Sequence, residues 1–168
     1  MAPKNQRWWL TEDRVSVLVD APAEHVYDLV ADLPRMGEWS PECRQVEWTD
    51  GATAAAVDAR FVGHNRGGPF GLMKWSRKGR VLRAERGREF TFATEEGGRE
   101  GVVWRYCFEP EGAGTRVTES YEVQWIPTWA RIVDVPTNRH RELVENMRRT
   151  LEQLKVAAET ANTAGGAA

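Results

Sequence analysis

The sequence predicts an α+β domain in which a curved antiparallel sheet wraps around one long amphipathic helix. Three observations lead to this prediction. A strand pattern and a helix pattern open the chain, about six strand-like segments with short glycine-rich turns follow, and one long helical stripe ends it. Short turns at such intervals are typical of antiparallel hairpins rather than βαβ units. An antiparallel sheet with a single amphipathic helix buries its apolar face by curling around that helix.

The first two elements show different periodicities. Residues 14–20, RVSVLVD, place alternate valines on one face and predict a strand. The following segment, APAEHVYDLVADL, has Pro22 where a helix begins and Val26, Leu29 and Val30 at helical spacing. Pro34 then either ends this helix or starts a second short helix that carries Met36 and Trp39.

The middle of the chain reads as a meander. Its segments alternate or are rich in β-forming residues, and they are separated by turn signals such as Asp50-Gly51 and Gly97-Gly98. The predicted strands cover residues 43–49, 57–65, 72–85, 88–95, 101–109 and 114–125.

One amphipathic helix closes the pattern. Its polar face is charged, and Glu145 can pair with Arg149 four residues later. Where the helix starts is open, because PTWARIVDVPTN can hold a helical turn before Pro136. The apolar stripe comprises His140, Leu143, Val144, Met147, Leu151, Leu154 and Ala158.

The bulk composition fits one globular domain. With 168 residues, 41% apolar and 29% charged, the chain is of ordinary single-domain size and composition. We divide it into an N-terminal extension at 1–12, the domain at 13–160 and a flexible tail at 161–168. A net charge of −2 with scattered Lys and Arg argues against a nucleic-acid binder or an anionic-membrane patch.

Cysteine and histidine usage gives no sign of a metal or a disulfide framework. Cys43 and Cys107 have neither the spacing of a disulfide framework nor that of a metal site. The three histidines form no metal-binding motif such as HxxxH. GHNRGGPFG lies between strands and lacks the Lys-Ser/Thr of a phosphate loop. No signal peptide or membrane span is visible. We therefore expect a cytoplasmic protein without a cofactor.

The alternation of polar and apolar residues divides the strand side chains between a solvent-exposed face and an aromatic face. Arg105, Arg116 and Glu122 belong to the solvent-exposed face. Eight tryptophans make the interior rich in flat rings, which either fill a core or line a cavity for a flat apolar ligand. The aromatic face carries Phe61, Trp75, Phe90, Phe92, Trp104, Tyr106, Phe108 and Tyr121.

Four polar residues share that apolar environment, and each needs a partner or a polar ligand atom. Glu119 either faces inward, pairs with an Arg, or turns to solvent at a bulge. Arg77 either points inward or extends to the rim. His140 is either a helix-start residue or a base, and Asn65 is either a turn former or a site residue.

The quoted segments resemble a known family. VLVDAPAEHVYDLVADLPRMGEWSPE, RFVGHNR, WRYCFEPEGAGTRVTES and MRRTLEQLKVAAE are similar to the SRPBCC (START-like, helix-grip) superfamily, in its polyketide cyclase/dehydrase-like branch common in actinobacteria. The resemblance covers roughly residues 13–160. It implies seven antiparallel strands around a long C-terminal helix, with a deep cavity closed at one end by two short helices. It also places Trp39 at the small-helix wall of that cavity.

The resemblance leaves two function classes. One is a carrier or sensor that binds a hydrophobic or aromatic small molecule, as a monomer or homodimer. The alternative is a cyclase/aromatase-type enzyme that folds a poly-ketone chain, with Arg77, Tyr106, Glu119 or His140 assisting proton transfer. A protein-docking role is a third option. The expected ligand-binding set is Trp39, Phe61, Asn65, Trp75, Phe90, Phe92, Trp104, Tyr106, Phe108, Glu119, Tyr121, His140, Val144 and Met147.

Overall fold

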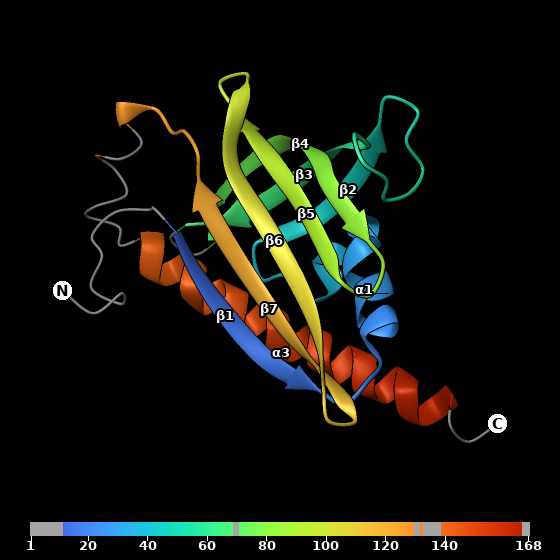
Figure 1. Cartoon of the computed structure of the whole chain (residues 1–168). Helices are drawn as coiled ribbons and strands as arrows, with labels where there is room; N and C mark the ends of the chain where they lie inside the picture. The colour runs from blue at the N-terminus through green and yellow to red at the C-terminus, as the bar shows by residue number, and fades with distance from the viewer. Residues whose placement is uncertain (1–11, 69–70, 130–131, 133–138, 166–168) are drawn as a thin grey trace.

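The computed structural model describes residues 12–68, 71–129, 132 and 139–165 (Figure 1). Seven strands form one antiparallel sheet in the order β1-β7-β6-β5-β4-β3-β2. A helix, α1, and a 3-10 helix, η2, follow the first strand, and one long helix, α3, ends the fold. The elements are β1 Glu12–Val19, α1 Ala23–Ala31, η2 Leu33–Glu38, β2 Cys43–Thr49, β3 Arg60–Gly67, β4 Met73–Glu85, β5 Glu89–Glu96, β6 Arg99–Glu111, β7 Gly114–Val123 and α3 Arg139–Gly165.

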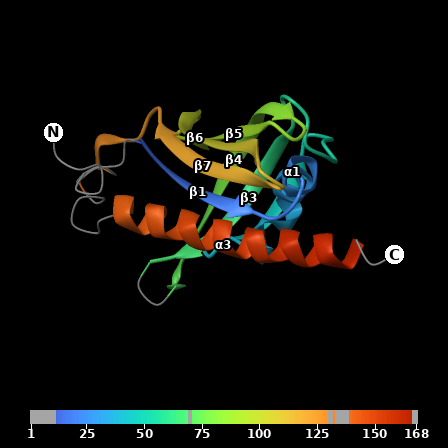
Figure 2. The same ribbon diagram turned by 60° about the horizontal axis from the view of Figure 1, so that its bottom comes forward.

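The sheet and α3 form two layers, as the turned view in Figure 2 shows. The sheet curves over the long helix, and α1 lies against one end of it, near the turn between β4 and β5. This arrangement confirms the predicted α+β, helix-grip architecture with seven antiparallel strands.

The segment after β1 contains both predicted helices. Pro22 precedes α1, whose buried face includes Val26 and Val30. Pro34 stands in the first turn of η2, so it starts a second short helix, the second of the two alternatives left open by the sequence.

Two predicted strand bounds shift for local reasons. β3 begins at Arg60 rather than at residue 57, because Asp58 has a positive φ of 69° and breaks the extended run. β7 ends at Val123 rather than at residue 125. There the amides of Gln124 and Trp125 both donate to the carbonyl of Gly101, at 2.8 and 3.1 Å, which turns the chain away. In contrast, the Gly97-Gly98 hairpin forms as predicted, with φ values of 57° and 77°.

The helix α3 buries the predicted stripe, except that Val144 is only partly buried. Glu145 and Arg149 form the predicted ion pair, at 3.2 Å. The helix continues to Gly165, although the sequence predicted a flexible tail from residue 161. The predicted turn before Pro136 lies largely outside the described residues. So does the predicted extension at 1–12, except for Glu12, which begins β1.

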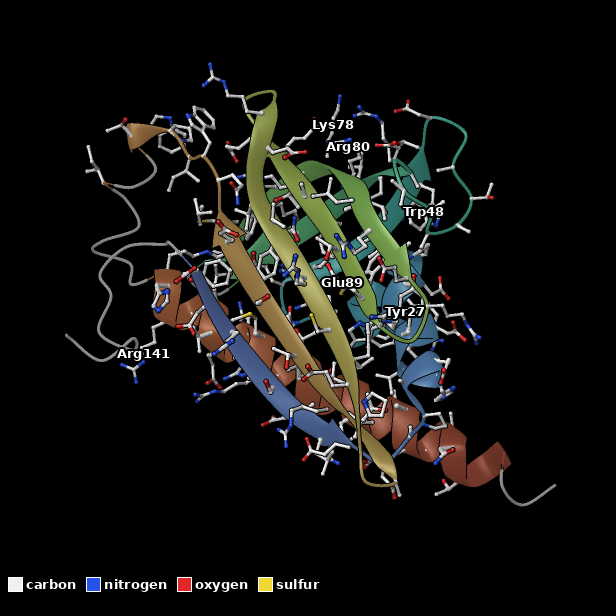
Figure 3. The ribbon with its side chains drawn as sticks, in the orientation of Figure 1. Tyr27, Trp48, Lys78, Arg80, Glu89 and Arg141 are labelled. Atoms are coloured by element: carbon white, nitrogen blue, oxygen red, sulfur yellow. The ribbon has the colours of Figure 1, made fainter. Side chains whose placement is uncertain are left out.

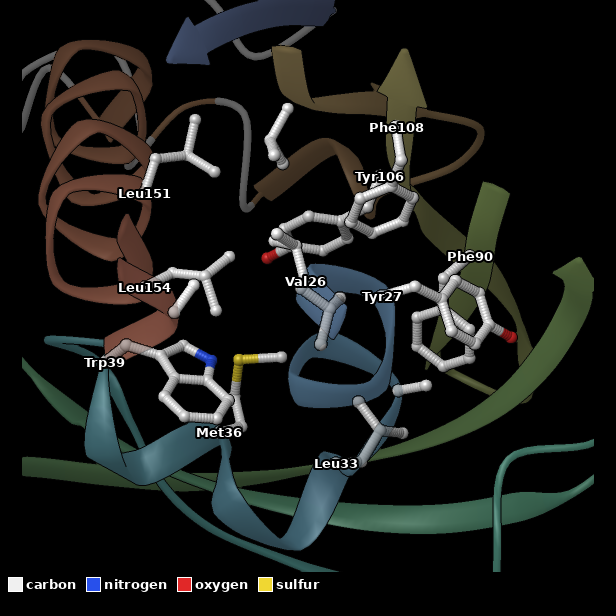
Figure 4. Close-up of a cluster of buried hydrophobic side chains, with 14 of the residues drawn as sticks. Val26, Tyr27, Leu33, Met36, Trp39, Phe90, Tyr106, Phe108, Leu151 and Leu154 are labelled. Atoms are coloured by element: carbon white, nitrogen blue, oxygen red, sulfur yellow. The ribbon is translucent and has the colours of Figure 1, made fainter. Parts of the chain in front are cut away.

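The main core lies between α1, η2, the inner sheet face and the second half of α3 (Figure 4). Trp39 is 2% exposed and lies beside Met36 and Leu154 in this core. Arg35 covers its ring, with the guanidinium carbon 5.4 Å from the ring centroid. Trp39, which directly follows η2, is therefore a core residue.

The outer face of the sheet is charged, as the alternation predicts (Figure 3). Glu89 lies between Arg83 and Arg105, at 3.5 and 3.1 Å. Lys78 is exposed, and Arg80 pairs with Asp58 and Glu100. Ligand binding on this face would compete with these ion pairs and with water, so the inner face is the better place for a binding site.

Candidate functional site

A cavity of about 290 Å³ lies between the inner sheet face, η2 and the first half of α3. It reaches the surface beside Trp129, whose side chain is largely exposed. Its walls combine aromatic and aliphatic side chains with polar and charged groups. The lining residues are Leu33, Met36, Ser40, Glu42, Cys43, Val46, Phe61, Gly63, Asn65, Trp75, Arg77, Phe92, Thr94, Glu96, Gly101, Val102, Trp104, Tyr106, Glu119, Ile126, Pro127, Trp129, Arg139, Leu143, Asn146, Met147 and Thr150.

Gly63 helps to create this space, and Gly79 makes room for the ring of a lining residue, Phe61. Gly63 occupies an inward position of β3 between Phe61 and Asn65, so no side chain projects there. A Cβ at this position would have no neighbour closer than 3.9 Å, so a side chain would extend into open volume. On β4, Gly79 lies opposite Phe61, and a Cβ there would be 2.3 Å from the ring. The Phe61 ring therefore lies against the backbone of β4 at Gly79.

Tyr106 and Glu119 form a buried polar pair in the cavity wall. They are cross-strand neighbours on β6 and β7, and both are nearly inaccessible to solvent. The Tyr106 hydroxyl donates to Oε1 of Glu119 at 2.7 Å. The second carboxyl oxygen, Oε2, is also buried and has no hydrogen-bond partner among the described residues.

Burial controls the protonation of this pair. Loss of water around the carboxyl raises the pKa of Glu119 to about 8, although the hydrogen bond from Tyr106 opposes the shift. Burial, followed by the nearby Glu119 charge, raises the pKa of Tyr106 well above its ordinary value. At neutral pH the pair is therefore a neutral phenol and a predominantly protonated carboxylic acid.

The charged residues of the cavity are paired with one another. Arg77 on β4 contacts Glu96 on β5 at 2.7 Å, and its side chain is 40% exposed. Arg139, in the first turn of α3, bonds to Glu42 at 2.5 Å and lies 5.9 Å above the Trp75 ring. At the rim of the cavity, the carboxylates of Glu96 and Glu42 therefore compensate both guanidinium charges.

The side-chain amide of Asn146 adds a further contact to the Arg139–Glu42 pair. Asn146 donates to the other oxygen of Glu42 at 3.1 Å. Burial opposes the charge of Arg139, but the hydrogen bond and charge of Glu42 outweigh burial and raise the pKa of the guanidinium. Sequence reasoning missed Glu42, Arg139 and Asn146, because they come from segments far apart in the chain and no local motif marks them.

Cys43 also borders the cavity. Burial raises the pKa of its thiol to about 11. A thiol in this state is a poor nucleophile at neutral pH, so Cys43 acts as a small apolar wall residue.

A second buried polar cluster lies at the N-terminal end of α3, outside the cavity lining. His140 is 3% exposed and its Nδ1 is 2.6 Å from the Tyr121 hydroxyl. Its Nε2 lies 3.2 Å from Oδ2 of Asp13, within ion-pair distance but outside hydrogen-bond geometry. Asp13 and Tyr121 are themselves cross-strand partners on β1 and β7. The cluster therefore ties α3 to two strands.

The structure divides the expected ligand-binding set between cavity and core. Those that border the cavity are Phe61, Asn65, Trp75, Phe92, Trp104, Tyr106, Glu119 and Met147. Arg77, a catalytic candidate, borders it too. Those that do not border it are Trp39, Phe90, Phe108, Tyr121, His140 and Val144.

Neighbouring elements explain the residues that lie away from the cavity. Phe90 and Phe108 face inward but pack on Tyr27 of α1, with ring centroids 6.1 and 5.6 Å away. Tyr121 and Val144 belong to a small cluster with Leu143 and Met147. Alternation along a strand predicts which face a side chain takes, but not which helix covers that position along the strand.

The described residues contain neither a metal-binding cluster nor a helix that could span a membrane. They contain no group of three or more His, Cys, Asp or Glu side chains arranged to hold a metal ion. No helix within them has both the length and the apolar character needed to cross a bilayer.

The fold and the cavity together define a helix-grip domain with an internal, largely apolar cavity. The chain belongs to the family described as polyketide cyclase/dehydrase and lipid transport, which it matches over residues 12–159. This membership confirms the resemblance noted in the sequence. No curated protein sequence matches the chain significantly.

Solved structures show the same fold. A polyketide-cyclase-like protein from Corynebacterium glutamicum is 30% identical, with a TM-score of 0.50 over 90% of this chain and 91% of its own. A protein from Deinococcus radiodurans has 22% identity and a TM-score of 0.63 over 90% of this chain and 99% of its own. The di-domain ARO/CYC StfQ from the steffimycin biosynthetic pathway has 14% identity and a TM-score of 0.73; the match covers 95% of this chain and 54% of StfQ.

Proposed function

We propose that this protein binds a small, flat, apolar molecule inside the cavity, as a carrier or sensor. The observation that carries the proposal is a cavity of about 290 Å³ with aromatic walls and with both arginines paired at its rim. Paired charges leave apolar burial as the main source of affinity. This volume is at the lower end of the roughly 300–1,000 Å³ typical of ligand pockets, which favours a compact ligand.

Native mass spectrometry of the purified full chain tests this proposal. We expect a stoichiometric adduct, which denaturing extraction then releases as an unmodified apolar molecule. The variant Gly63→Leu fills the inward position on β3 and is expected to lose the adduct while it keeps its fold. The control Val62→Leu also introduces a leucine, but on the opposite face of the same strand, and is expected to retain the adduct.

The two variants together decide the result. Equal adduct in Gly63→Leu and in the wild type would place the ligand elsewhere and overturn the proposal. Thermal unfolding of both variants checks that they are folded. A leucine in place of a strand glycine is tolerated by the backbone here, because the nearest atoms to its Cβ are 3.9 Å away.

A second candidate function is a cyclase/aromatase-type activity, favoured by the protonated acid in the cavity wall and by the family. In an aldol ring closure, a C–C bond forms between an enol carbon and a ketone carbon of one bound chain. Glu119 would donate its proton to the ketone oxygen, which becomes a hydroxyl group. The enol hydroxyl gives up its proton to the Glu119 carboxylate, and this restores the acid. Tyr106 would position the carboxyl through its 2.7 Å hydrogen bond.

Turnover of a poly-ketone substrate tests this second candidate. Glu119→Gln cannot transfer the proton, so its kcat is expected to fall at least about a hundredfold, in line with the usual contribution of general acid catalysis. His140→Leu serves as the control, since His140 lies outside the cavity. Equal rates for wild type and Glu119→Gln would remove Glu119 from the chemistry.

A further inference from the structure

We propose that Glu119 makes the cavity selective for neutral ligands that carry a hydrogen-bond-accepting oxygen, and that it acts as a proton-bearing donor toward them. This inference rests on the proposed binding function and specifies its ligand class. The selectivity comes from one buried hydrogen-bond donor, the carboxyl group of Glu119. The aromatic walls supply affinity for polar and apolar ligands alike.

The position of the proton follows from the geometry of the pair. The Tyr106 hydroxyl has one proton and donates it to Oε1 of Glu119. The carboxyl proton is then carried by Oε2, which is buried and has no partner among the described residues. A buried donor left without a partner is costly, so a ligand oxygen placed there gains stability that an apolar ligand lacks.

The charges around Glu119 point to a neutral ligand. The titratable groups that line the same cavity are Tyr106, Cys43, the Arg77–Glu96 pair and the Arg139–Glu42 pair. Each guanidinium already contacts a carboxylate, and no ion pair joins Glu119 to a cation among the described residues. An anionic ligand would thus find no free counter-charge in this lining, and would meet the carboxyl of Glu119.

An amine ligand is the main alternative chemistry. A buried carboxylate among aromatic rings can bind an ammonium group. It would first have to lose its proton, however, and burial raises the pKa of Glu119 to about 8. A neutral acceptor binds the protonated form directly. The two chemistries predict opposite pH dependences, so a titration separates them.

The experiment uses four naphthalene probes of similar shape and the full-length protein. They are 2-acetonaphthone as the neutral acceptor, 2-ethylnaphthalene as the apolar match, 2-naphthoate as the anion and 2-naphthylmethylamine as the cation. Equilibrium dialysis gives each Kd between pH 5.5 and 9.5. At pH 6 we expect 2-acetonaphthone to bind about tenfold more tightly than 2-ethylnaphthalene. This preference is expected to disappear as the pH rises through about 8.

Two variants assign the effect to Glu119. Glu119→Gln keeps an amide donor in place of the acid, so the preference for the ketone is expected to persist at every pH. Glu119→Leu removes the donor and is expected to bind both neutral probes equally. The wild-type titration stands without either variant if one of them fails to fold.

Three results would overturn the inference. One is equal binding of the two neutral probes at pH 6. Another is tightest binding of the amine, strengthening as the pH rises. The third is tightest binding of the naphthoate. If 2-ethylnaphthalene still binds in any of these cases, the proposed binding function survives. If none of the four probes binds, the proposed function fails with the inference.

Discussion

Glu119 and Tyr121 are buried polar side chains on the same face of strand β7, and they have different surroundings. Glu119 borders the cavity and bonds to Tyr106, and its buried Oε2 has no partner among the described residues. Tyr121 bonds to His140 of α3, which in turn lies beside Asp13 of β1. The two side chains are two residues apart, so sheet alternation gives them the same inward direction.

The comparison shows how to tell a candidate site from a structural contact. The Tyr121 cluster joins three elements and lies outside the cavity, so its polar groups serve the attachment of α3. The Glu119 pair joins β6 and β7 in the cavity wall, and leaves one carboxyl oxygen without a partner among the described residues. Burial is almost the same for Glu119 and His140, at 4% and 3% exposure, so burial alone does not distinguish them.

The largest expected effect is on the pH dependence of stability. The pKa of Glu119 rises from its ordinary value of 4.5 to about 8 in the fold. Between these values the folded chain keeps a proton that the unfolded chain releases, so rising pH favours unfolding. The contribution of Glu119 is fully present below about pH 4.5 and is lost by about pH 8, a change of up to roughly 5 kcal/mol.

Urea denaturation of the wild type and of Glu119→Gln measures this loss. Other titrating groups are common to both proteins, so the difference between their unfolding free energies isolates Glu119. We expect that difference to shift in favour of the Gln variant as the pH rises from 5 to 8. A difference that is constant with pH would mean that Glu119 is ionised in the fold, and would weaken its assignment as a donor.

The next effect concerns the second cluster. His140→Leu removes the 2.6 Å bond to Tyr121 and the contact with Asp13. We expect a loss of about 1–3 kcal/mol in stability, the usual effect of disrupting a buried polar contact. The affinity for 2-acetonaphthone is expected to change less than about threefold, since His140 does not border the cavity.

Arg141→Leu is the matched control for this prediction. Arg141 is the next residue of α3 and is exposed, pointing away from the sheet (Figure 3). Its replacement is expected to change stability by less than about 0.5 kcal/mol. A large loss of affinity in His140→Leu, with the fold intact, would make the second cluster part of the binding site.

Periodicity predicted the fold well, because it records which side of each element is buried. The valines of β1 and the stripe of α3 faced the core as their spacing indicated, and Gly97-Gly98 formed its turn. The errors lay where contacts with other segments decide. β7 stops at Val123 because Gln124 and Trp125 bond to a residue of β6.

The site was less predictable, since a cavity depends on what is missing as much as on what is present. The inward alternation of RFVGHN could have identified Gly63, but a glycine carries no chemistry that draws attention. The rim pair of Glu42 and Arg139 required a contact between residues 97 positions apart in the sequence. Phe90 was predicted to face inward and does, yet α1 covers it.

The smallest expected effect separates the rim from the cavity wall. Arg77 and Glu96 form a partly exposed ion pair, and such pairs contribute about 0–1 kcal/mol. Arg77→Met keeps most of the apolar stem and is expected to lower stability by less than about 1 kcal/mol. It is expected to change the affinity for 2-acetonaphthone less than about threefold, because Glu119 lies deeper and bonds to Tyr106 instead.

Glu96→Gln provides the complementary test, since it frees Arg77 at the rim. This variant is expected to gain modest affinity for 2-naphthoate, about two- to fivefold at low salt, and to lose the gain at high salt. If Arg77→Met instead abolished binding of the neutral ketone, Arg77 would be the polar anchor. The ligand oxygen would then lie at the guanidinium of Arg77 rather than at Glu119. The accessible rim pair, and not the buried donor, would determine ligand binding.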